Sequence, residues 1–484
     1  MIRITSYAGR RVAVVGLARS GLAAARALAA GGAEVVAWDD GERSRERAAA
    51  EGIPVADLRR TGWQGIAALV LAPGIPLTHP KPHWSVEAAR AAGVPVIGDT
   101  TLFFRELALQ PKGGRPKVIG ITGTNGKSTT TALTAHLLRA AGKRVAMGGN
   151  IGEAVLGLAP FDEVDVYVLE LSSYQIDLTW RPEDGIDPGI GCDVGVLLNL
   201  SPDHLDRHGG MEHYAAVKER LVAHSRVPLV GVDDPSARAI AMRHLRTGTS
   251  GQALHIESDA TRSASAVTPE DLQPLKNAGV LLSYTAADAQ RLATPVLRGP
   301  HNLQNIAAAT RASICLLGSG PAAMEALQAG LASFPGLAHR MELIGRVGET
   351  AYVNDSKATN ADSTVKALAS FDDILWILGG RPKEGGIESL RPFFGRVRRA
   401  FLIGEASESF AATLASEVPH EACGTLESAV QRVADVAGNG PATVLLSPAC
   451  ASFDQFKDFE DRGEQFRAFC RALPGFAPFD AKLP

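Results

Sequence analysis

A glycine-rich turn between a predicted strand and a predicted helix constrains the fold more than any other feature of the sequence. A strand is expected at residues 117–121, and the segment GITGTNGKST, residues 120–129, leads into a helical stretch from about Ser128. Strand, glycine turn, Lys-Ser pair and helix in this order are typical of a loop that binds phosphate groups. The common G-x-x-x-x-G-K-[ST] spacing is not met, because Ile121 takes its first glycine position. A glycine turn with an incidental lysine therefore remains the alternative.

Apolar runs alternate with helical stretches along the chain, which favours an α/β fold built on parallel sheets. Its 484 residues correspond to about three domains of ordinary size. We expect a Rossmann-like domain at 1–109, a P-loop-type domain with a mostly parallel sheet at 110–334, and a second Rossmann-like domain at 335–484. No element is predicted for residues 246–300. Strands are expected at 11–15, 35–38, 68–71, 94–97, 117–121, 164–169, 194–198, 351–353, 374–378, 400–403 and 443–446.

The composition excludes several classes of partner. Lys plus Arg is 49 and Asp plus Glu is 52, a formal charge of −3, which gives no basic surface for nucleic acid or anionic membrane. No apolar run approaches the roughly 18 residues of a membrane span, and the first residues show no leader pattern. The five cysteines lack the spacing of metal or redox motifs, so they are expected to be buried apolar side chains. We expect a cytoplasmic monomer with no nucleic-acid or membrane partner.

A second glycine turn, Gly16 to Gly21, follows the first predicted strand and opens a helix, with Asp39 about 20 residues further on. This arrangement is similar to a dinucleotide-binding turn, but Ala18 stands where that motif has its second glycine. Two interpretations remain open: a diphosphate bound at the helix N-terminus, or tight strand–helix packing without a ligand. A nicotinamide-dependent dehydrogenase is the competing function for this segment.

Six segments in order carry a resemblance to a known family. They are GTNGKST (123–129), LELSSYQ (169–175), DHLDR (203–207), HNLQN (301–305), NDSKATN (354–360) and LSPACAS (446–452). Together they resemble the Mur ligase family, and the last two resemble its glutamate-adding members. The resemblance covers nearly the whole chain and implies a UDP-binding domain, a central ATPase domain and a C-terminal amino-acid-binding domain. The related folylpolyglutamate synthases have Gly-Lys-Gly-Ser in their phosphate loop, which is absent here.

The resemblance implies an ATP-dependent ligase of peptidoglycan precursor synthesis. Its substrates would be ATP, UDP-N-acetylmuramoyl-L-alanine and D-glutamate, although the sequence leaves the enantiomer of glutamate open. A substrate carboxylate would be phosphorylated by ATP, and the amine of glutamate would then displace the phosphate. Three alternatives remain: a Mur ligase that adds another amino acid, a dehydrogenase, and a nucleotide-binding regulator without turnover.

The same resemblance assigns the catalytic groups Lys127, Glu170, His204 and Lys218. Ser128 and Glu170 would hold one Mg²⁺ ion, and His204 with Lys218, as a CO₂-derived carbamate, would hold a second. From the residues alone, Glu170 could be a solvated acid at a strand end, His204 a surface histidine, and Lys218 an ordinary helix lysine.

The remaining site residues are also assigned by resemblance. Asn302 and Asn305 could be only helix caps, Lys383 could be a solvated loop lysine, and residues 180–192 are longer than the usual connection. The expected ATP-binding residues are Gly123, Thr124, Asn125, Gly126, Lys127, Ser128, Thr129, Asn302, Asn305, Arg340, Asp355 and Lys357. The expected UDP-substrate residues are Ala18, Arg19, Ser20, Asp39, Gly74 and Asn150, and the expected glutamate residues are Thr359, Lys383, Ser452 and Phe459.

Overall fold

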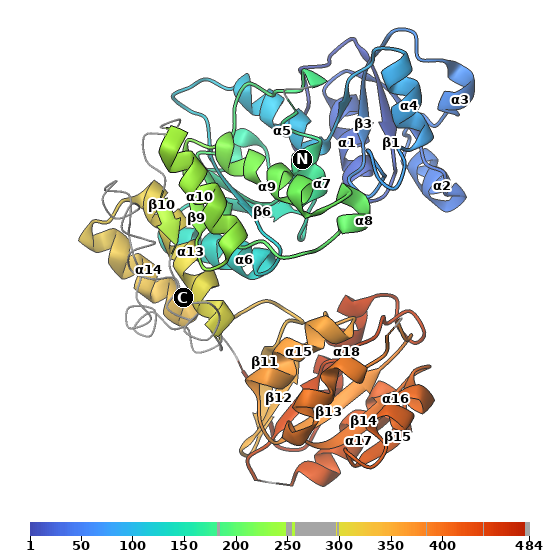
Figure 1. Ribbon diagram of the computed structural model, residues 1–484, viewed down its shortest axis with the longest axis vertical. Helices are drawn as coiled ribbons and strands as arrows, with labels where there is room; N and C mark the ends of the chain where they lie inside the picture. The colour runs from blue at the N-terminus through green and yellow to red at the C-terminus, as the bar shows by residue number, and fades with distance from the viewer. Residues whose placement is uncertain are drawn as a thin grey trace. The chain divides into compact units, whose positions relative to one another are not determined.

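The computed structural model confirms an α/β chain with three sheets (Figure 1). It describes residues 1–181, 184–247, 254–256, 297, 300–383, 385–438 and 440–479. The chain divides into two compact units, one of Met1–Ala293 with Pro300–Ala332 and one of Thr294–Gly299 with Ser333–Pro484. The first unit contains two sheets and the second unit contains one. No helix in the described part of the chain is long and apolar enough to cross a membrane.

The first sheet is parallel throughout, with strand order β2-β1-β3-β4. The run RVAVV forms its central strand, and residues 12–15 are at most 1% exposed because helices cover both faces. Its elements are β1 (Arg11–Val15), α1 (Arg19–Ala30), β2 (Glu34–Trp38), α2 (Glu42–Ala50), α3 (Leu58–Thr61), β3 (Ile66–Leu71), α4 (Trp84–Ala91), β4 (Val96–Ile97) and α5 (Asp99–Ala108).

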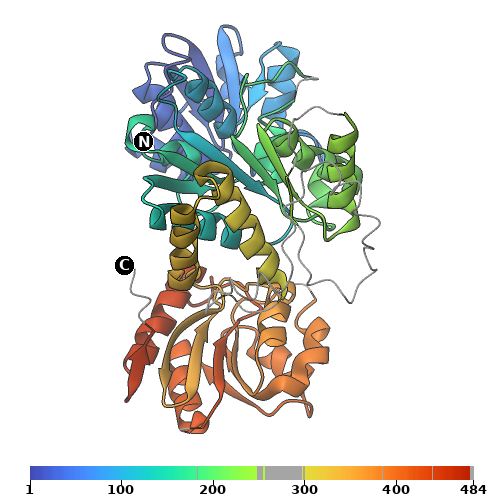
Figure 2. The same ribbon diagram turned by 90° about the vertical axis from the view of Figure 1, so that its left-hand side faces the viewer.

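The second sheet is also parallel, with strand order β10-β9-β8-β5-β7-β6. The strands on either side of β5 are β8 and β7, and both lead into polar segments that are predicted to bind ligands. The helix α13 packs against α6 (Figure 2). Its elements are β5 (Lys117–Thr122), α6 (Lys127–Ala140), β6 (Val145–Gly149), η1 (Val155–Gly157), η2 (Phe161–Glu163), β7 (Val166–Glu170), α7 (Ser173–Asp177), β8 (Val194–Leu197), α8 (Leu205–His208), α9 (Met211–Ala223), β9 (Val227–Gly231), α10 (Pro235–Thr247), β10 (Leu254–Ile256), α13 (Pro300–Leu317) and α14 (Pro321–Ser333).

The two sheets of the first unit share one hydrophobic core. A single cluster contains Val12 and Leu28 from the first sheet layer and Tyr167 and Leu221 from the second. Hydrogen bonds reinforce this packing, because the Thr101 hydroxyl donates to the carbonyl of Leu178 at 2.6 Å. A shared apolar core explains why these sheets form one unit although the sequence suggests two domains. The predicted boundaries at residues 109 and 334 stay predictions.

The third sheet has strand order β15-β14-β13-β16-β12-β11-β17. Its first five strands are parallel, and β11 runs antiparallel to both β12 and β17. The sequence predicts only the four strands β12, β13, β14 and β16 and not β11 or the two edge strands, and both edge strands are short or polar. The elements are β11 (Glu342–Val347), β12 (Thr350–Asn354), α15 (Ala361–Ser370), β13 (Ile374–Gly379), η5 (Glu388–Arg396), β14 (Val397–Ile403), α16 (Ser407–Leu414), β15 (His420–Gly424), α17 (Leu426–Ala437), β16 (Thr443–Leu446), α18 (Phe459–Arg471) and β17 (Phe476–Pro478).

Candidate active site

The glycine turn at 123–126 joins β5 to α6, as the sequence predicts. Gly126 is the N-cap of α6 and has φ 83°, in the left-handed region that favours glycine. A Cβ atom added to Gly126 would lie 2.2 Å from Oδ1 of Asn305, so a side chain is excluded on two grounds. The turn is also bonded to the segment that follows β8, because the Thr124 amide donates to the carbonyl of Asn199 at 2.9 Å. The glycine backbone and this hydrogen bond therefore both support the shape of the loop.

A Gly126→Ala substitution is expected to weaken ATP binding by at least about tenfold. The left-handed backbone costs a non-glycine residue roughly 1–2 kcal/mol, and the new methyl group must also displace Asn305. The change is measured as the Kd for ATP. Gly142→Ala is the matched control, because Gly142 has φ 77° just beyond the other end of α6 but no atom within 4 Å of an added Cβ. Equal ATP affinities for the two variants would contradict the prediction.

Two lysines converge on the phosphate loop. The Lys127 ammonium donates to the carbonyls of Gly123 at 2.9 Å and Thr124 at 2.7 Å. The Lys218 ammonium donates to the Gly123 carbonyl at 2.9 Å and to the Thr122 hydroxyl at 3.2 Å. Lys218 is 2% exposed, so the alternative of an ordinary solvated lysine is wrong. Burial, reinforced by the charge of Lys127, lowers the pKa of Lys218 well below its usual value, which favours a neutral amine.

Glu170 ends β7, next to β5, and is 2% exposed. The alternative of a solvated strand-end acid is therefore wrong. Its Oε1 accepts a hydrogen bond from the Asn150 side chain at 2.8 Å, whereas its buried Oε2 has no hydrogen-bond partner among the described residues. A buried carboxylate oxygen without a partner is costly unless a cation balances it. Glu170, at the end of β7, and the Ser128 hydroxyl, in the first turn of α6, are the hard oxygen donors that Mg²⁺ prefers, so these residue types fit the predicted ion.

His204 occupies a different environment from Glu170 and Lys218. Its side chain is 50% exposed, it has a left-handed backbone with φ 52° at the start of α8, and its Nε2 lies 3.4 Å from Oδ2 of Asp203. Asp203 is thus a neighbouring acid placed to orient this histidine. The second Mg²⁺ site stays a prediction.

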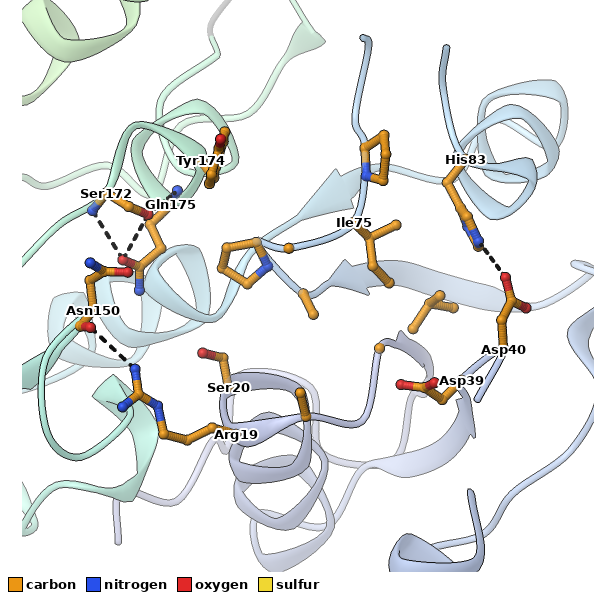
Figure 3. Close-up of a pocket in the computed structure, with 17 residues that line it drawn as sticks. Arg19, Ser20, Asp39, Asp40, Ile75, His83, Asn150, Ser172, Tyr174 and Gln175 are labelled. Atoms are coloured by element: carbon orange, nitrogen blue, oxygen red, sulfur yellow. Dashed lines mark hydrogen bonds and ion pairs between the residues drawn. The ribbon is translucent and has the colours of Figure 1, made fainter. Parts of the chain in front are cut away.

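A pocket of about 550 Å³ lies in the first unit, at the carboxyl ends of β1 and β3 (Figure 3). All six predicted UDP-substrate residues line it: Ala18, Arg19, Ser20, Asp39, Gly74 and Asn150. The Arg19 guanidinium, at the start of α1, donates to the carbonyls of Gly152 at 2.7 Å and Asn150 at 3.2 Å. Because these acceptors carry no net charge, the positive charge of Arg19 suits an anionic ligand.

The two neighbouring acids of this pocket differ in role. The Asp39 carboxylate accepts hydrogen bonds from the backbone amides of Leu17 at 2.6 Å and Gly41 at 2.7 Å, so it fixes the glycine turn. Asp40 instead accepts a hydrogen bond from His83 Nε2 at 2.9 Å (Figure 3). Partial burial would raise the pKa of Asp40, but hydrogen bonds from His83 and two tryptophans outweigh it and lower the pKa to about 2. His83 was missed by the sequence reading, since a single loop histidine carries no pattern.

The structure shows the close strand–helix packing at the first glycine turn, and a diphosphate bound there stays a prediction. A Cβ atom on Gly21 would lie 1.7 Å from the Gly16 carbonyl oxygen, so this glycine serves close packing of turn and helix. Ala18, Arg19 and Ser20, which lie between these two glycines, line the pocket. The same segment therefore combines close packing with a turn that faces the pocket.

Asn302 and Asn305 lie inside α13, which begins at Pro300. The Asn305 amide donates to Oδ1 of Asn302 at 3.0 Å, and its own Oδ1 accepts from the Thr130 hydroxyl at 3.2 Å. The helix-cap alternative is therefore wrong, because these side chains connect α13 to the helix that follows the phosphate loop.

In the second unit, the predicted ATP-binding and glutamate-binding residues other than Arg340 follow the carboxyl ends of β12, β13 and β16, which are neighbours in the sheet. Ser452 is 2% exposed, whereas Lys383 is exposed, so the alternative of a solvated loop lysine remains for it. A bridge between Arg381 and Ala451 holds their two loops side by side. The Lys357 ammonium lies 3.7 Å from the ring centroid of Phe459, and Thr359 follows on the same loop.

Asp355 is nearly buried, while Arg340, which precedes β11, is exposed. The Asp355 carboxylate accepts from the Ser447 hydroxyl at 2.8 Å and from the Met341 amide at 3.1 Å. Burial raises the pKa of Asp355 to about 7 despite these hydrogen bonds. In this structure Asp355 connects β12, β16 and the start of β11, and contact with ATP stays a prediction.

Comparison with known proteins identifies the family. Residues 121–313 match the Mur ligase middle domain, and residues 339–450 match the Mur ligase glutamate ligase domain. A protein of Nitrobacter winogradskyi named UDP-N-acetylmuramoylalanine–D-glutamate ligase is 53% identical over 99% of this chain and 100% of its own length. A protein of the same name from Rhizobium meliloti is 51% identical over 98% of this chain and 99% of its own length. The chain belongs to the Mur ligase family.

Solved structures of other Mur ligases share the fold. UDP-N-acetylmuramate-alanine ligase MurC from Thermotoga maritima has a TM-score of 0.53 at 15% identity and covers 94% of this chain and 98% of its own. UDP-N-acetylmuramoyl-L-alanyl-D-glutamate–2,6-diaminopimelate ligase has a TM-score of 0.52 at 19% identity and covers 86% and 94%. At these identities the likeness supports the α/β fold of this Mur ligase and nothing finer.

The long segment 180–192 of this Mur ligase begins with two residues that contact both sheets of the first unit. Its described part begins with Trp180, which is buried and stacks on His224 with ring centroids 5.6 Å apart. The Arg181 guanidinium donates to the carbonyl of Val96 at 2.9 Å. None of the five cysteines forms a disulfide. Cys192, Cys450 and Cys470 are buried as expected, whereas Cys315 and Cys423 are only partly buried.

Proposed function

We propose that this Mur ligase uses ATP to join D-glutamate to UDP-N-acetylmuramoyl-L-alanine during peptidoglycan precursor synthesis. The observation that carries the proposal is 53% identity over nearly the full length to a relative named for that reaction. The buried groups around the phosphate loop support it, because an ATP-dependent ligase needs cations and a metal site at the γ-phosphate. The proposal places the UDP substrate on residues 1–109, ATP on 110–334 and the amino acid on 335–484, in a cytoplasmic monomer.

The first step would form an acyl phosphate. The terminal carboxylate of UDP-N-acetylmuramoyl-L-alanine attacks the γ-phosphorus of ATP, and ADP leaves with the electron pair of the broken P–O bond. Lys127 balances the charge on the β- and γ-phosphates while the amides of the loop hold their oxygens. Mg²⁺, held by Ser128 and Glu170, would neutralise phosphate charge during this step.

The second step would form the amide. The amine of glutamate attacks the acyl carbon, phosphate leaves, and the nitrogen loses a proton. Lys383, Thr359 and Ser452 would bind the two carboxylates of glutamate, since a dicarboxylate needs a cation and several hydrogen-bond donors. Arg19, Ala18 and Ser20 would hold the diphosphate of the other substrate at the start of α1, where helix amides favour anions.

The proposed function is tested by phosphate release with ATP, Mg²⁺ and UDP-N-acetylmuramoyl-L-alanine. D-glutamate, L-glutamate, L-alanine and L-lysine are compared as second substrates, and the amide product is identified by mass spectrometry. We expect release to depend on D-glutamate. Stimulation by another amino acid alone would assign the chain to a different Mur ligase activity. ATP binding without release would indicate a regulator.

We further propose that Lys218 is carbamylated in the active enzyme. Its neutral amine attacks CO₂, forms an N–C bond and loses a proton, which converts a buried amine into a carboxylate-like metal ligand. With His204, this group would hold the second Mg²⁺ ion.

Activity is therefore expected to fall when CO₂ and bicarbonate are removed, and to return when they are restored. A Lys218→Ala protein is expected to lose about 10²-fold or more in kcat, as for loss of a charge-stabilising group. The ¹³C resonance of a carbamate, after incubation with ¹³C-bicarbonate, reports the modification directly. Lys143→Ala, at an exposed position beyond α6, is the control. Full activity of Lys218→Ala at low bicarbonate would refute the role.

A further inference from the structure

A histidine–carboxylate cluster lies in the first unit and is not used by the proposed reaction. Asp177 ends α7, His208 ends α8, and His213 lies in the first turn of α9. Each offers one ligand atom, and these atoms all lie within 4.8 Å of one another. We propose that the three side chains bind a transition-metal ion of the Zn²⁺ class.

His208 shows the arrangement of a metal-binding imidazole. It is 2% exposed, and its Nε2 lies 2.9 Å from the Ser173 hydroxyl. Its Nδ1 is buried and has no hydrogen-bond partner in the described part of the chain. If Nε2 carries the proton and donates it to Ser173, Nδ1 presents a lone pair, and metal-ligating histidines are usually oriented by such a second hydrogen bond.

Aromatic rings fix the orientation of this imidazole. The Tyr174 ring stacks on it with centroids 5.5 Å apart and an angle of 8° between the planes. Tyr214 packs from another side at 5.3 Å, and the His213 ring lies 5.7 Å away. An imidazole that cannot rotate loses little conformational freedom when it coordinates an ion. This fixed orientation favours a bound metal ion over a mobile network of water molecules.

Asp177 supplies the anionic ligand. It is 6% exposed, and its Oδ1 accepts a hydrogen bond from Arg220 at 2.9 Å, which orients the carboxylate and leaves Oδ2 for a metal ion. Two imidazoles and one carboxylate match the protein ligands of many zinc sites that keep a fourth position for water. Nitrogen donors disfavour Mg²⁺ relative to transition metals, so this cluster differs in class from the oxygen donors at Glu170.

The test uses Co²⁺, whose visible absorption reports nitrogen coordination and tetrahedral geometry, on the full-length protein in excess Mg²⁺. Equilibrium dialysis gives the stoichiometry and Kd, and added Zn²⁺ should displace the Co²⁺. We compare the natural protein with His213→Gln and Asp177→Asn, each of which removes one ligand. His420→Gln, which changes a partly exposed histidine of the second unit, is the matched control. Glu170→Gln removes the predicted Mg²⁺ ligand, and circular dichroism checks that each variant is folded.

We expect one Co²⁺ per chain in the natural protein, the control and Glu170→Gln. Affinity should fall at least about tenfold in His213→Gln and Asp177→Asn, because loss of even an outer-shell partner typically costs 10–100-fold. Absence of binding to the natural protein would overturn the proposal. Unchanged binding in the folded ligand variants, or loss of binding in Glu170→Gln, would overturn it as well. These measurements need no turnover, so their outcome is separate from that of the ligase assay.

Discussion

The Lys127→Ala protein is expected to lose about 10³-fold in kcat for ATP-dependent amide formation, the upper range for removing one preorganised charge-stabilising donor. Lys127 begins α6, and its ammonium already lies on the loop, bonded to the carbonyls of Gly123 and Thr124. An arriving phosphate would replace these weak acceptors with anionic oxygens. Negative charge moves onto ADP as it leaves. With alanine at position 127, the Lys127 ammonium no longer compensates this charge.

The measurement is amide product formed per enzyme under saturating substrates, together with phosphate release. Lys143→Ala is again the control, since Lys143 lies just beyond the end of α6 at an exposed position. The pKa of Lys218 provides a second readout. The charge of Lys127 helps to lower that pKa, so Lys127→Ala should raise it and weaken carbamate formation at a given pH. An amide-forming rate equal to that of the natural protein would refute the mechanism.

Glu170→Gln is expected to reduce kcat/KM by about 10²–10³-fold and to raise the Mg²⁺ concentration needed for half-maximal activity. The substitution preserves the shape of the side chain and an oxygen that can accept from Asn150, but it removes the negative charge. Because Oε2 is buried without a hydrogen-bond partner among the described residues, a metal ion gives the best physical account of the carboxylate. The measurement is a Mg²⁺ titration of initial rates.

Glu163→Gln is the matched control, because Glu163 is exposed in the short helix before β7 and should not change the titration. The Asn150 hydrogen bond provides an independent check. Asn150→Ala should raise the Mg²⁺ concentration for half-maximal activity less than Glu170→Gln does. It removes a group that orients the Glu170 carboxylate but leaves the carboxylate itself. A Mg²⁺ titration for Glu170→Gln that superimposes on that of the natural protein would exclude a metal role for this carboxylate.

Local patterns in the sequence were sufficient for the α/β class and for the position of the phosphate loop. Buried parallel strands are continuous apolar runs, and a glycine turn with a Lys-Ser pair has a specific meaning between strand and helix. The strands β6, β9, β10, β11, β15 and β17 were not predicted. For the edge strands β15 and β17 the reason is that a partly exposed strand has no continuous apolar run. The shared core of the first two sheets was also missed, since packing between sheets leaves no local periodicity.

The sequence by itself determined which residue types follow each strand, and six ordered segments were enough to indicate the family. Only the tertiary structure decided what surrounds each side chain. It brought Lys218 from α9 to the carbonyl of Gly123, tied Asp39 to the backbone while Asp40 joined His83, and gathered Asp177, His208 and His213 from three helices. The physical reason is that the charge, the pKa and the metal affinity of a side chain depend on its burial and on neighbours that are distant in the chain. Residue type and spacing alone encode neither the burial nor these neighbours.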